Sequence, residues 1–244
     1  MTGSSIRVIV VDIDGTLTVS PEEYSLHLRA VEVIRRLRKE GYKVVLASGN
    51  SVPMVLGLAR YIDSSDTVVA ENGGAIAHSD SIKWLCDAEE MSRLVEIERI
   101  LAESMRSILK KSWQNDFMKC SKAFKIIRSD LSVSSVVNMI KSVLRDNDFN
   151  NYSIAYSKFA IHLNPRTCDK ASAVEEILKL YNYSWDNTLA IGDSEIDREM
   201  LIRARYGCVV SNAPIELSKE IKCRSQYPAG EGFIDIVKNI IGLE

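Results

Sequence analysis

The chain has 244 residues, of which 46% are hydrophobic and 26% are charged, and its formal net charge is −2. These values describe a globular protein with a sizeable core in one large or two smaller domains, and a typical nucleic-acid-binding protein is more basic. No apolar run approaches the length of a membrane span, and the first residues, MTGSSIRV, lack the pattern of a signal peptide. We therefore expect a cytoplasmic protein that binds neither nucleic acid nor membrane.

A short apolar run from Ile6 to Val11 is followed by two carboxylates, Asp12 and Asp14, and a Gly-Thr turn. Its β-branched composition predicts a buried strand that carries both acids at its carboxyl end. Open α/β sheets bind their ligands outside the carboxyl ends of the strands, so Asp12 and Asp14 are candidates for an active site. The alternative is a strand that ends in a solvated acidic turn.

Strands and helices alternate up to residue 79. Apolar residues at helical spacing predict a helix over residues 30–37, and Gly41 follows where a helix end favours glycine. The strand YKVVLASGNS comes next, then a helix that starts at Ser51 and Pro53 and ends near Ile62, and then a third strand, DTVVAENGG. Because helices join these strands, we expect parallel pairing and a doubly wound, Rossmann-like α/β core.

The pattern changes near residue 80. An amphipathic segment at about residues 88–111 predicts a helix, which precedes a strand-like AFKIIR, a helix-like LSVSSVVNMIKSVLR and two strand-like pieces, YSIAYS and FAIHLN, around Lys158. This order is typical of a small antiparallel sheet with helices on one face. We interpret residues 80–163 as an inserted α+β cap domain, and residues 1–79 and 164–244 as the core.

The first pattern resumes after residue 164. Lys170 lies in the first turn of a predicted helix whose cap is Thr167 or Asp169. TLAIGDSEIDREM predicts a strand, a break and a new helix, and because Asp193 and Asp197 are four residues apart, their carboxylates can face one loop region. A fifth strand is predicted at GCVVSNAP, with helices around residues 215–221 and 232–240.

Five cysteines are scattered along the chain, at Cys86, Cys120, Cys168, Cys208 and Cys223. Their number is odd, and no two of them form a C-x-x-C pair. This usage predicts reduced structural thiols rather than disulfides or a zinc site.

Four of these sequence features together resemble the motifs of haloacid dehalogenase-like phosphohydrolases. They are DIDGTLT, the serine of ASGN, Lys170 and GDSEID, in that order and separated by helices. ENGG after the third strand, with an α+β insertion between the second and third motifs, looks like the branch of the family with a type-two cap. The resemblance covers the core, whereas the cap matches only in position and class.

The resemblance implies that Asp12 is a nucleophile that forms an aspartyl-phosphate and that Asp14 is the general acid and base. Residues two apart on a strand point to the same side, which places Asp14 beside the scissile bond. Clustered carboxylates require a hard cation, so Mg²⁺ is the expected cofactor. Its expected ligands are Asp12, Asp193 and the backbone carbonyl of Asp14, with Asp197 acting directly or through water.

The resemblance also implies phosphate-binding roles. Ser48 and the backbone of Gly49 would hydrogen-bond the transferred phosphoryl group, and Lys170 would neutralise its charge. Taken singly, Ser48 also fits a turn residue, Lys170 a solvated helix charge, and Asp197 an ordinary acid in a first helical turn.

Position 196 departs from the family pattern, because related enzymes usually carry asparagine there and this chain has Ile196. The absent amide puts the support of the motif loop in question, but not the nucleophile. We expect Ile196 to turn into the core and Ser194 or Asn212 to supply the polar contact instead.

The expected cap is basic where it should face the core. Between residues 106 and 128 there are seven basic residues and one acid, and a basic cap over an acidic site would attract a substrate that is anionic at both ends. The candidates for the distal substrate group are Lys122, Lys125, Arg128 and His162. A regular strand cannot point both Lys122 and Lys125 into the cleft, and a solvated charged face is the alternative.

These features predict a magnesium-dependent phosphomonoester hydrolase that acts on a small phosphorylated metabolite. Within the family the compact build most resembles phosphoglycolate phosphatases, and 2-phosphoglycolate, with a phosphate and a carboxylate, suits a basic cap. The alternatives are a sugar-phosphate phosphatase, a phosphotransferase or mutase, and a binding protein that kept the fold and lost turnover. The sequence leaves a homodimer open.

Overall fold

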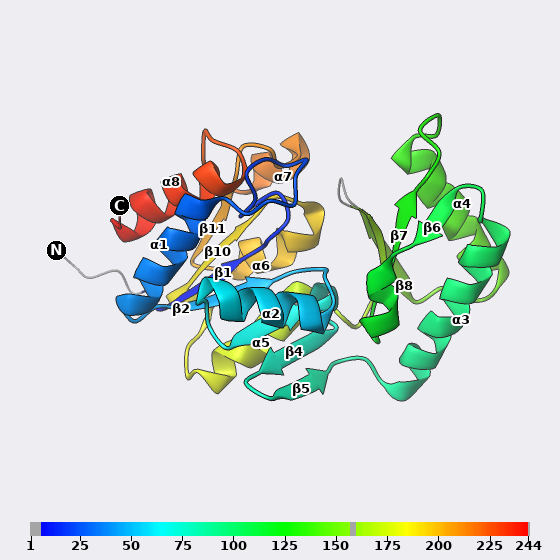
Figure 1. The fold of residues 1–244 in the computed structure, drawn as a ribbon, viewed down its shortest axis with the longest axis horizontal. Coiled ribbons are helices and arrows are strands. Elements are labelled where there is room, and N and C mark those ends of the chain that lie inside the picture. The colour runs from blue at the N-terminus through cyan, green and yellow to red at the C-terminus, as the bar shows by residue number, and fades with distance from the viewer. Residues whose placement is uncertain (1–5, 157–159, 244) are drawn as a thin grey trace.

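The chain folds into two bodies, each built on one β-sheet (Figure 1). The structure is a computed structural model that describes residues 6–156 and 160–243. The larger body holds both ends of the described chain, and the smaller body is an insertion between them. We call the segment from Asp87 to Arg166 the cap and the remainder the core.

The core sheet has eight strands in the order β12-β11-β10-β1-β2-β3-β4-β5, and it is parallel from β12 to β3. β4 pairs antiparallel with both of its neighbours, β3 and β5. The strands are β1 (Val8–Val11), β2 (Lys43–Ala47), β3 (Thr67–Ala70), β4 (Ala75–His78), β5 (Ser81–Trp84), β10 (Thr188–Gly192), β11 (Tyr206–Val209) and β12 (Cys223–Arg224). The fully buried β1 lies near the middle, as its apolar sequence predicts.

Helices cover both faces of this sheet, which confirms the doubly wound α/β core. One face packs on α1 (Leu28–Lys39), α2 (Val52–Ile62) and α8 (Ala229–Ile241), and the other on α5 (Lys170–Leu180), α6 (Arg198–Arg203) and α7 (Ile215–Glu220). Along β1, Ile9 and Val11 join the first hydrophobic cluster, whereas Val8 and Val10 join the second. This alternation follows the period of two of a strand. Within the described part of the chain, no helix is both long and apolar enough to span a membrane.

The cap is an antiparallel sheet with helices on one face. Its strands lie in the order β6-β7-β9-β8, and a separate hydrophobic cluster joins the sheet to its helices. The elements are α3 (Ala88–Ser104), β6 (Leu109–Lys111), β7 (Lys122–Ile126), α4 (Val133–Asp146), β8 (Tyr152–Tyr156) and β9 (Ile161–Pro165). Of the expected strand FAIHLN, Phe159 lies outside the described residues, as does the expected break at Lys158.

Two boundaries differ from the sequence expectations. The helix expected up to residue 111 ends at Ser104, because the chain then turns into the short strand β6. Residues 81–84 form β5, which pairs with β4 in the core sheet, so the core extends past the expected boundary at residue 80. A tight turn at Ser79, whose φ is +53°, joins β4 to β5. In the sequence, the polar residues of this turn look like the end of a domain. In the part of the chain that the structure describes, four 3₁₀ turns complete the fold: η1 (Glu71–Gly73), η2 (Trp113–Phe117), η3 (Trp185–Asn187) and η4 (Glu195–Asp197).

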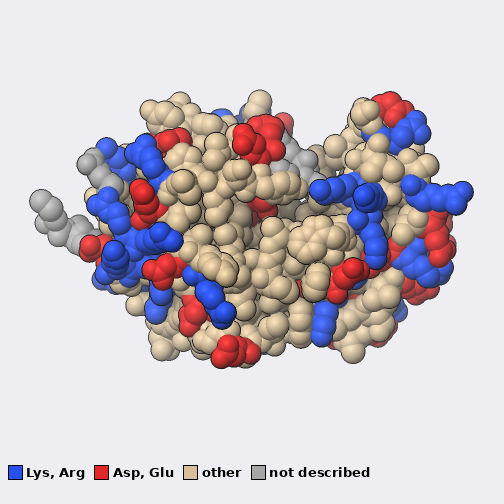
Figure 2. All heavy atoms as spheres, in the orientation of Figure 1, with Lys and Arg blue, Asp and Glu red and all other residues tan. Residues whose placement is uncertain are grey.

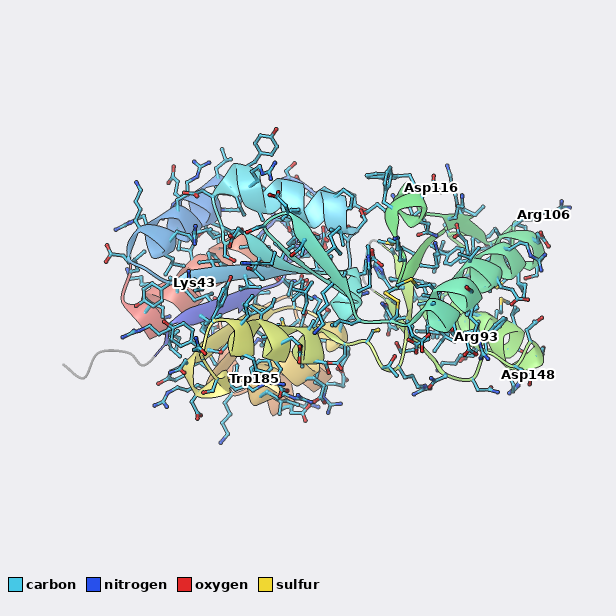
Figure 3. The ribbon with its side chains drawn as sticks, turned by 90° about the horizontal axis from the view of Figure 1, so that it is seen from below. Lys43, Arg93, Arg106, Asp116, Asp148 and Trp185 are labelled. Carbon is cyan, nitrogen blue, oxygen red and sulfur yellow. A yellow bond between two sulfur atoms is a disulfide. The ribbon has the colours of Figure 1, made fainter. Side chains whose placement is uncertain are left out.

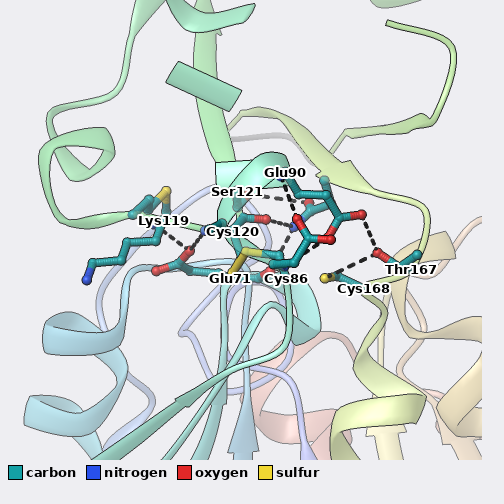
Figure 4. The surroundings of a disulfide bond; sticks show 12 residues. Glu71, Cys86, Glu90, Lys119, Cys120, Ser121, Thr167 and Cys168 are labelled. Carbon is teal, nitrogen blue, oxygen red and sulfur yellow. Dashed lines mark hydrogen bonds between the residues drawn. A yellow bond between two sulfur atoms is a disulfide. The ribbon is translucent and has the colours of Figure 1, made fainter. Parts of the chain in front are cut away.

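The prediction of reduced cysteines is wrong for four of the five. Cys208 and Cys223, opposite each other in the pairing of β11 with β12, form one disulfide. The second joins Cys86, in the entry to the cap, with Cys120, just before β7 (Figure 4). Cys168 is free and buried beside this second disulfide. The sequence could not reveal these pairs because tertiary contacts, and not short spacing, bring the partners together.

Candidate active site

The carboxyl ends of three neighbouring parallel strands meet at one edge of the core sheet. Asp12 follows β1, Ser48 follows β2, and Asp193 follows β10. β1 pairs with both β2 and β10, so the order of the strands gathers side chains that are far apart in sequence. This is the position where open α/β sheets bind ligands.

Lys170 reaches this edge from the first turn of α5. Asp169 caps the helix by accepting a hydrogen bond from the backbone N–H of Ser172. The Lys170 Nζ donates to Asp12 Oδ1 at 2.6 Å and to Asp197 Oδ1 at 2.7 Å, and all three side chains are buried. Their burial and pairing argue against reading Lys170 as a solvated helix charge.

Burial raises the pKa of Asp12, and the nearby carboxylates of Asp197 and Asp193 raise it further against the attraction of Lys170. For Lys170, burial alone would lower the pKa of the ammonium, but Asp12 and Asp197 outweigh burial and raise it. The site therefore keeps a charged ammonium in a region crowded with acids. Because the carboxylates outnumber the single ammonium of Lys170, the site favours the binding of an additional cation.

Asp12, Asp193 and Asp197 each place a carboxylate oxygen so that these atoms lie within 4.8 Å of one another. An oxygen-only donor set suits a hard cation such as Mg²⁺. Asn212 orients the exposed side of the group, because its Nδ2 donates to Asp193 Oδ2 at 2.9 Å and to the carbonyl of Gly15 at 3.1 Å. A Cβ atom at Gly15 would lie 2.3 Å from Asp193 Oδ2, so only glycine fits there.

Asp197 holds the loop that carries Asp193. Its Oδ2 accepts from the backbone N–H of Asp193 at 3.2 Å and from the backbone and hydroxyl of Ser194 at 3.1 and 3.0 Å. Its Oδ1 is engaged by Lys170. Since both oxygens already accept hydrogen bonds, this geometry favours contact between Asp197 and a metal through water.

Asp14 lies beside the second motif. Asn50 Nδ2 donates to Asp14 Oδ2 at 2.7 Å and to Ser48 Oγ at 3.0 Å, and the Asn50 backbone N–H also donates to Ser48 Oγ. Burial raises the pKa of Asp14, and the hydrogen bond from Asn50 opposes that effect. Asn50 was missed at the sequence level, although its signal was present as the last letter of ASGN.

Asn72 is a second missed residue of the site. It adopts a left-handed backbone with φ +53°, and it lines the cleft together with Gly49. A Cβ atom at Gly49 would lie 2.7 Å from Asn72 Oδ1, so glycine allows this close approach. Asn72 is part of the ENGG sequence, which indicated the branch of the family but not a role for this residue in the site.

Between core and cap these residues line a cleft of about 220 Å³. The core contributes Asp12, Asp14, Asp193, Lys170 and Gly49. The cap contributes Lys125 and His162, as well as Trp113 and Gln114, which the sequence did not single out. Figure 2 shows the hollow between the two bodies, with basic side chains gathered on the cap beside it. The geometry is that of a buried carboxylate and ammonium pair that a small ligand can reach.

Comparison with known proteins agrees with this geometry. A sequence profile described as haloacid dehalogenase-like hydrolase matches residues 9–110 and 97–236. The chain belongs to this family. Two similar proteins are named phosphoglycolate phosphatase: one from Staphylothermus marinus, 30% identical over 97% of this chain and 98% of its own, and one from Sulfolobus acidocaldarius, 32% identical over 97% of each.

Solved structures of other proteins share the whole fold. A crystal structure from Thermoplasma acidophilum, 28% identical, covers 96% of this chain and 98% of its own with a TM-score of 0.79. The sucrose-phosphatase of Synechocystis, crystallised with sucrose and phosphate, is 17% identical and covers 96% and 97% with a TM-score of 0.67. The second likeness shows the fold alone.

Two of the four cap residues expected to meet substrate do not line this cleft of the hydrolase. Lys122 is buried in the cap, where Nζ pairs with Glu98 at 3.0 Å and donates to the carbonyls of Asn115 and Met118. Arg128 is exposed and pairs with Asp130 at 2.6 Å. As the alternation of β7 requires, Lys125 points to the cleft and Lys122 does not.

The expectation for Ile196 is correct in one part and wrong in the other. Asn212 and Ser194 do supply polar contacts, the first to Asp193 and the second to Asp197. Ile196 itself is half-buried and lines the cleft, not the core. The 3₁₀ turn η4 places it there, so it offers an apolar surface to a ligand of this hydrolase.

Proposed function

We propose that this hydrolase is a Mg²⁺-dependent phosphomonoesterase that works through an aspartyl-phosphate on Asp12. The observation that carries the proposal is the buried 2.6 Å contact of Lys170 with Asp12, inside a group of carboxylates at the end of β1. An ammonium at this place holds a phosphoryl group beside the nucleophile and offsets its charge. The family match and the names of the relatives support phosphoester hydrolysis.

In the first step, a carboxylate oxygen of Asp12 bonds to phosphorus while the bond from phosphorus to the alcohol oxygen breaks. Asp14 gives its carboxyl proton to that leaving oxygen. Because burial raises the pKa of Asp14, its protonated form persists to higher pH than in an exposed aspartate. Ser48 Oγ accepts two N–H bonds from Asn50, so its own hydroxyl proton remains for the phosphoryl oxygens.

In the second step, Asp14 takes a proton from water, and the water oxygen bonds to phosphorus while the bond from phosphorus to Asp12 breaks. The step yields inorganic phosphate and restores both side chains. Asp12 and Asp193 would hold Mg²⁺, with Asp197 acting through water, and the bound ion would neutralise charge on the phosphoryl oxygens.

The proposed substrate is a small phosphoester with a second anionic group, such as 2-phosphoglycolate. Lys125, on the cap side of the cleft, is the cation for that group. His162 lines the same side, and burial, with some repulsion from Lys170, lowers its pKa to about 4, so it is a neutral hydrogen-bonding group. Among the described residues the buried His162 Nδ1 has no hydrogen-bond partner. The names of the relatives support this substrate class.

A sugar phosphate is the second candidate. Trp113 and Tyr24 line the cleft, and aromatic faces together with a neutral histidine suit sugar hydroxyl and C–H groups. A neutral distal group would leave Lys125 without its ion pair, so we place this candidate second.

The decisive experiment measures phosphate release after removal of metal by a chelator and addition of Mg²⁺. We expect release from 2-phosphoglycolate that exceeds release from a panel of sugar phosphates and that disappears without metal. No release from any phosphoester would refute hydrolysis. A phosphotransferase or mutase would instead move the group to an acceptor, so free phosphate from a single substrate favours the hydrolase.

The variant Asp12→Asn tests the nucleophile and separates catalysis from mere binding. We expect kcat to fall roughly 10³-fold or more, since the amide cannot form the acyl-phosphate. Mass spectrometry must show that the asparagine has not deamidated. Near-normal turnover in an intact variant would contradict the assignment of Asp12, and binding without turnover in the wild type would favour a non-catalytic protein.

A further inference from the structure

One side chain of the cap, that of Gln114, reaches across the cleft to the loop that carries the second motif. Gln114 lies in η2, and its Nε2 donates to Asn50 Oδ1 at 2.7 Å, while its Oε1 accepts from the backbone N–H of Ser51 at 2.8 Å. Figure 3 labels Asp116 in the same turn, at the side of the cap that approaches α2. Gln114 lies in none of the four sequence motifs. Among the contacts of the described residues, it makes no direct bond to an acid of the site.

The direction of these hydrogen bonds is fixed from one end. A backbone N–H can only donate, so Ser51 forces the oxygen of Gln114 toward itself and the NH₂ of Gln114 toward Asn50. Asn50 must then turn its oxygen to Gln114 and its NH₂ to Asp14 and Ser48. The free choice that an asparagine amide normally has is thereby removed.

We propose that Gln114 is a positioning residue, which fixes the amide of Asn50 and through it Asp14 and Ser48 when the cap lies against the core. The inference rests on the proposed function, because it assigns Asp14 as the acid and base of that reaction. Without Gln114, the Asn50 amide can rotate and present its oxygen to Asp14, which orients the carboxyl group less well. Because Gln114 acts only when the cap lies against the core, proton transfer by Asp14 is efficient only while the cap covers the substrate.

The cap is built to hold Gln114 in place. Ser112 Oγ accepts from the Gln114 backbone N–H, and the Ser112 backbone N–H donates to the carbonyl of Ala123 in β7. Asn115 Oδ1 accepts from the Ala123 N–H, and Lys122 Nζ donates to the carbonyl of Asn115. This gives Lys122, which does not meet the cleft, a structural reason to be buried.

The test compares Gln114→Met, Asn50→Ala and the double variant in steady-state hydrolysis of the best substrate of the panel. Methionine keeps the length of the side chain and removes both hydrogen bonds. For Gln114→Met we expect kcat to fall roughly three- to tenfold, as for the loss of one oriented hydrogen bond, with KM changed less than about twofold. In the Asn50→Ala background the same replacement should have no further effect on kcat, because the two residues act in series.

Asp116→Ala is the matched control, since Asp116 is exposed on the same turn and pairs with Lys111. It should leave kcat and KM at the wild-type values. A Gln114→Met effect on KM alone, or an equal loss of kcat in both backgrounds, would overturn the inference and leave the hydrolase assignment intact. Absence of wild-type turnover would instead refute the proposed function.

A second readout follows the amide itself. The side-chain NH₂ signal of Asn50, identified by its absence in Asn50→Ala, should be protected from solvent exchange in the wild type and lose that protection in Gln114→Met. Equal protection in both proteins would overturn the positioning role, whatever the activity.

Discussion

At the scale of single residues, Lys170 carries the strongest prediction. Lys170→Met removes the ammonium from between Asp12 and Asp197, which leaves neighbouring buried carboxylates without their partner. We expect kcat to fall about 10²- to 10³-fold, the usual cost of losing a preorganised electrostatic contact. Lys179→Met, on the same helix but exposed, is the control for the charge change. Comparable activity of the two variants would remove Lys170 from the site.

The cap cations give a second prediction at this scale. Lys125 lines the cleft, whereas Arg128 pairs with Asp130 outside it. Lys125→Ala should raise KM for a substrate with a distal carboxylate by roughly tenfold, the order of magnitude of one charged hydrogen bond. It should change KM much less for a phosphoester without that group. Arg128→Ala should leave both values unchanged, and a reversed order would mean that the substrate lies differently.

Residues at the ends of strands could be predicted because their signals are local. Asp12 and Asp14 follow an apolar run directly, and Lys170 follows its own cap residue. Gln114 could not be predicted, because its role exists only where a turn of the cap meets a loop 64 residues earlier in the chain. Lys122 was misassigned for the same reason, since the sequence shows its charge but not the partner Glu98.

At the scale of elements, long periodic segments were predicted well and short ones poorly. The helices at α1, α2 and α5 lie where their apolar spacing and caps place them. By contrast, β6 and β12 have three and two residues, too few for any period to show, and only their neighbours in the sheets define them. The core extends past the expected cap boundary at residue 80, because residues 81–84 form another short strand, β5, in the core sheet.

The disulfide between β11 and β12 supports one of these short strands and can be tested. Cys208 and Cys223 are 15 residues apart, and closing a loop of that length stabilises a protein by about 3 kcal/mol. In a variant with Cys86 and Cys120 both replaced by Ala, reduction should lower the free energy of unfolding by about that amount. Further replacement of Cys208 and Cys223 should abolish the effect of the reductant. If reduction changes nothing before that step, this bond does not form.

At the scale of the whole molecule, Glu71 joins core to cap. It is fully buried in the loop after β3, and its Oε2 accepts the backbone N–H groups of Lys119 and Cys120 at 3.0 and 2.7 Å (Figure 4). Asn164, where the chain leaves the cap, donates to the carbonyl of Glu71 at 2.8 Å. Burial raises the pKa of Glu71 to about 7, although these N–H groups oppose the shift.

This raised pKa predicts how pH affects the junction. The neutral carboxyl is the favoured form in the folded protein, so its contribution is complete below the unfolded pKa of 4.5 and is lost as pH rises through about 7. Glu71→Gln cannot ionise and escapes that loss. The free energy of unfolding of Glu71→Gln minus that of wild type should therefore increase by about 3 kcal/mol from pH 4.5 to pH 8. Urea unfolding of both proteins at both pH values measures this change.

The exposed carboxylate of Glu103 provides the matched control, because it lies on α3 and pairs with Arg99 in solvent. Glu103→Gln should differ from wild type by a similar small amount at both pH values, as expected for a surface ion pair. The acids of the active site titrate in the wild type and in both variants, so their contribution cancels in the comparison. If Glu71→Gln also shows the same difference from wild type at pH 4.5 and pH 8, then folding does not raise the pKa of Glu71, and the junction between cap and core is not sensitive to pH through this residue.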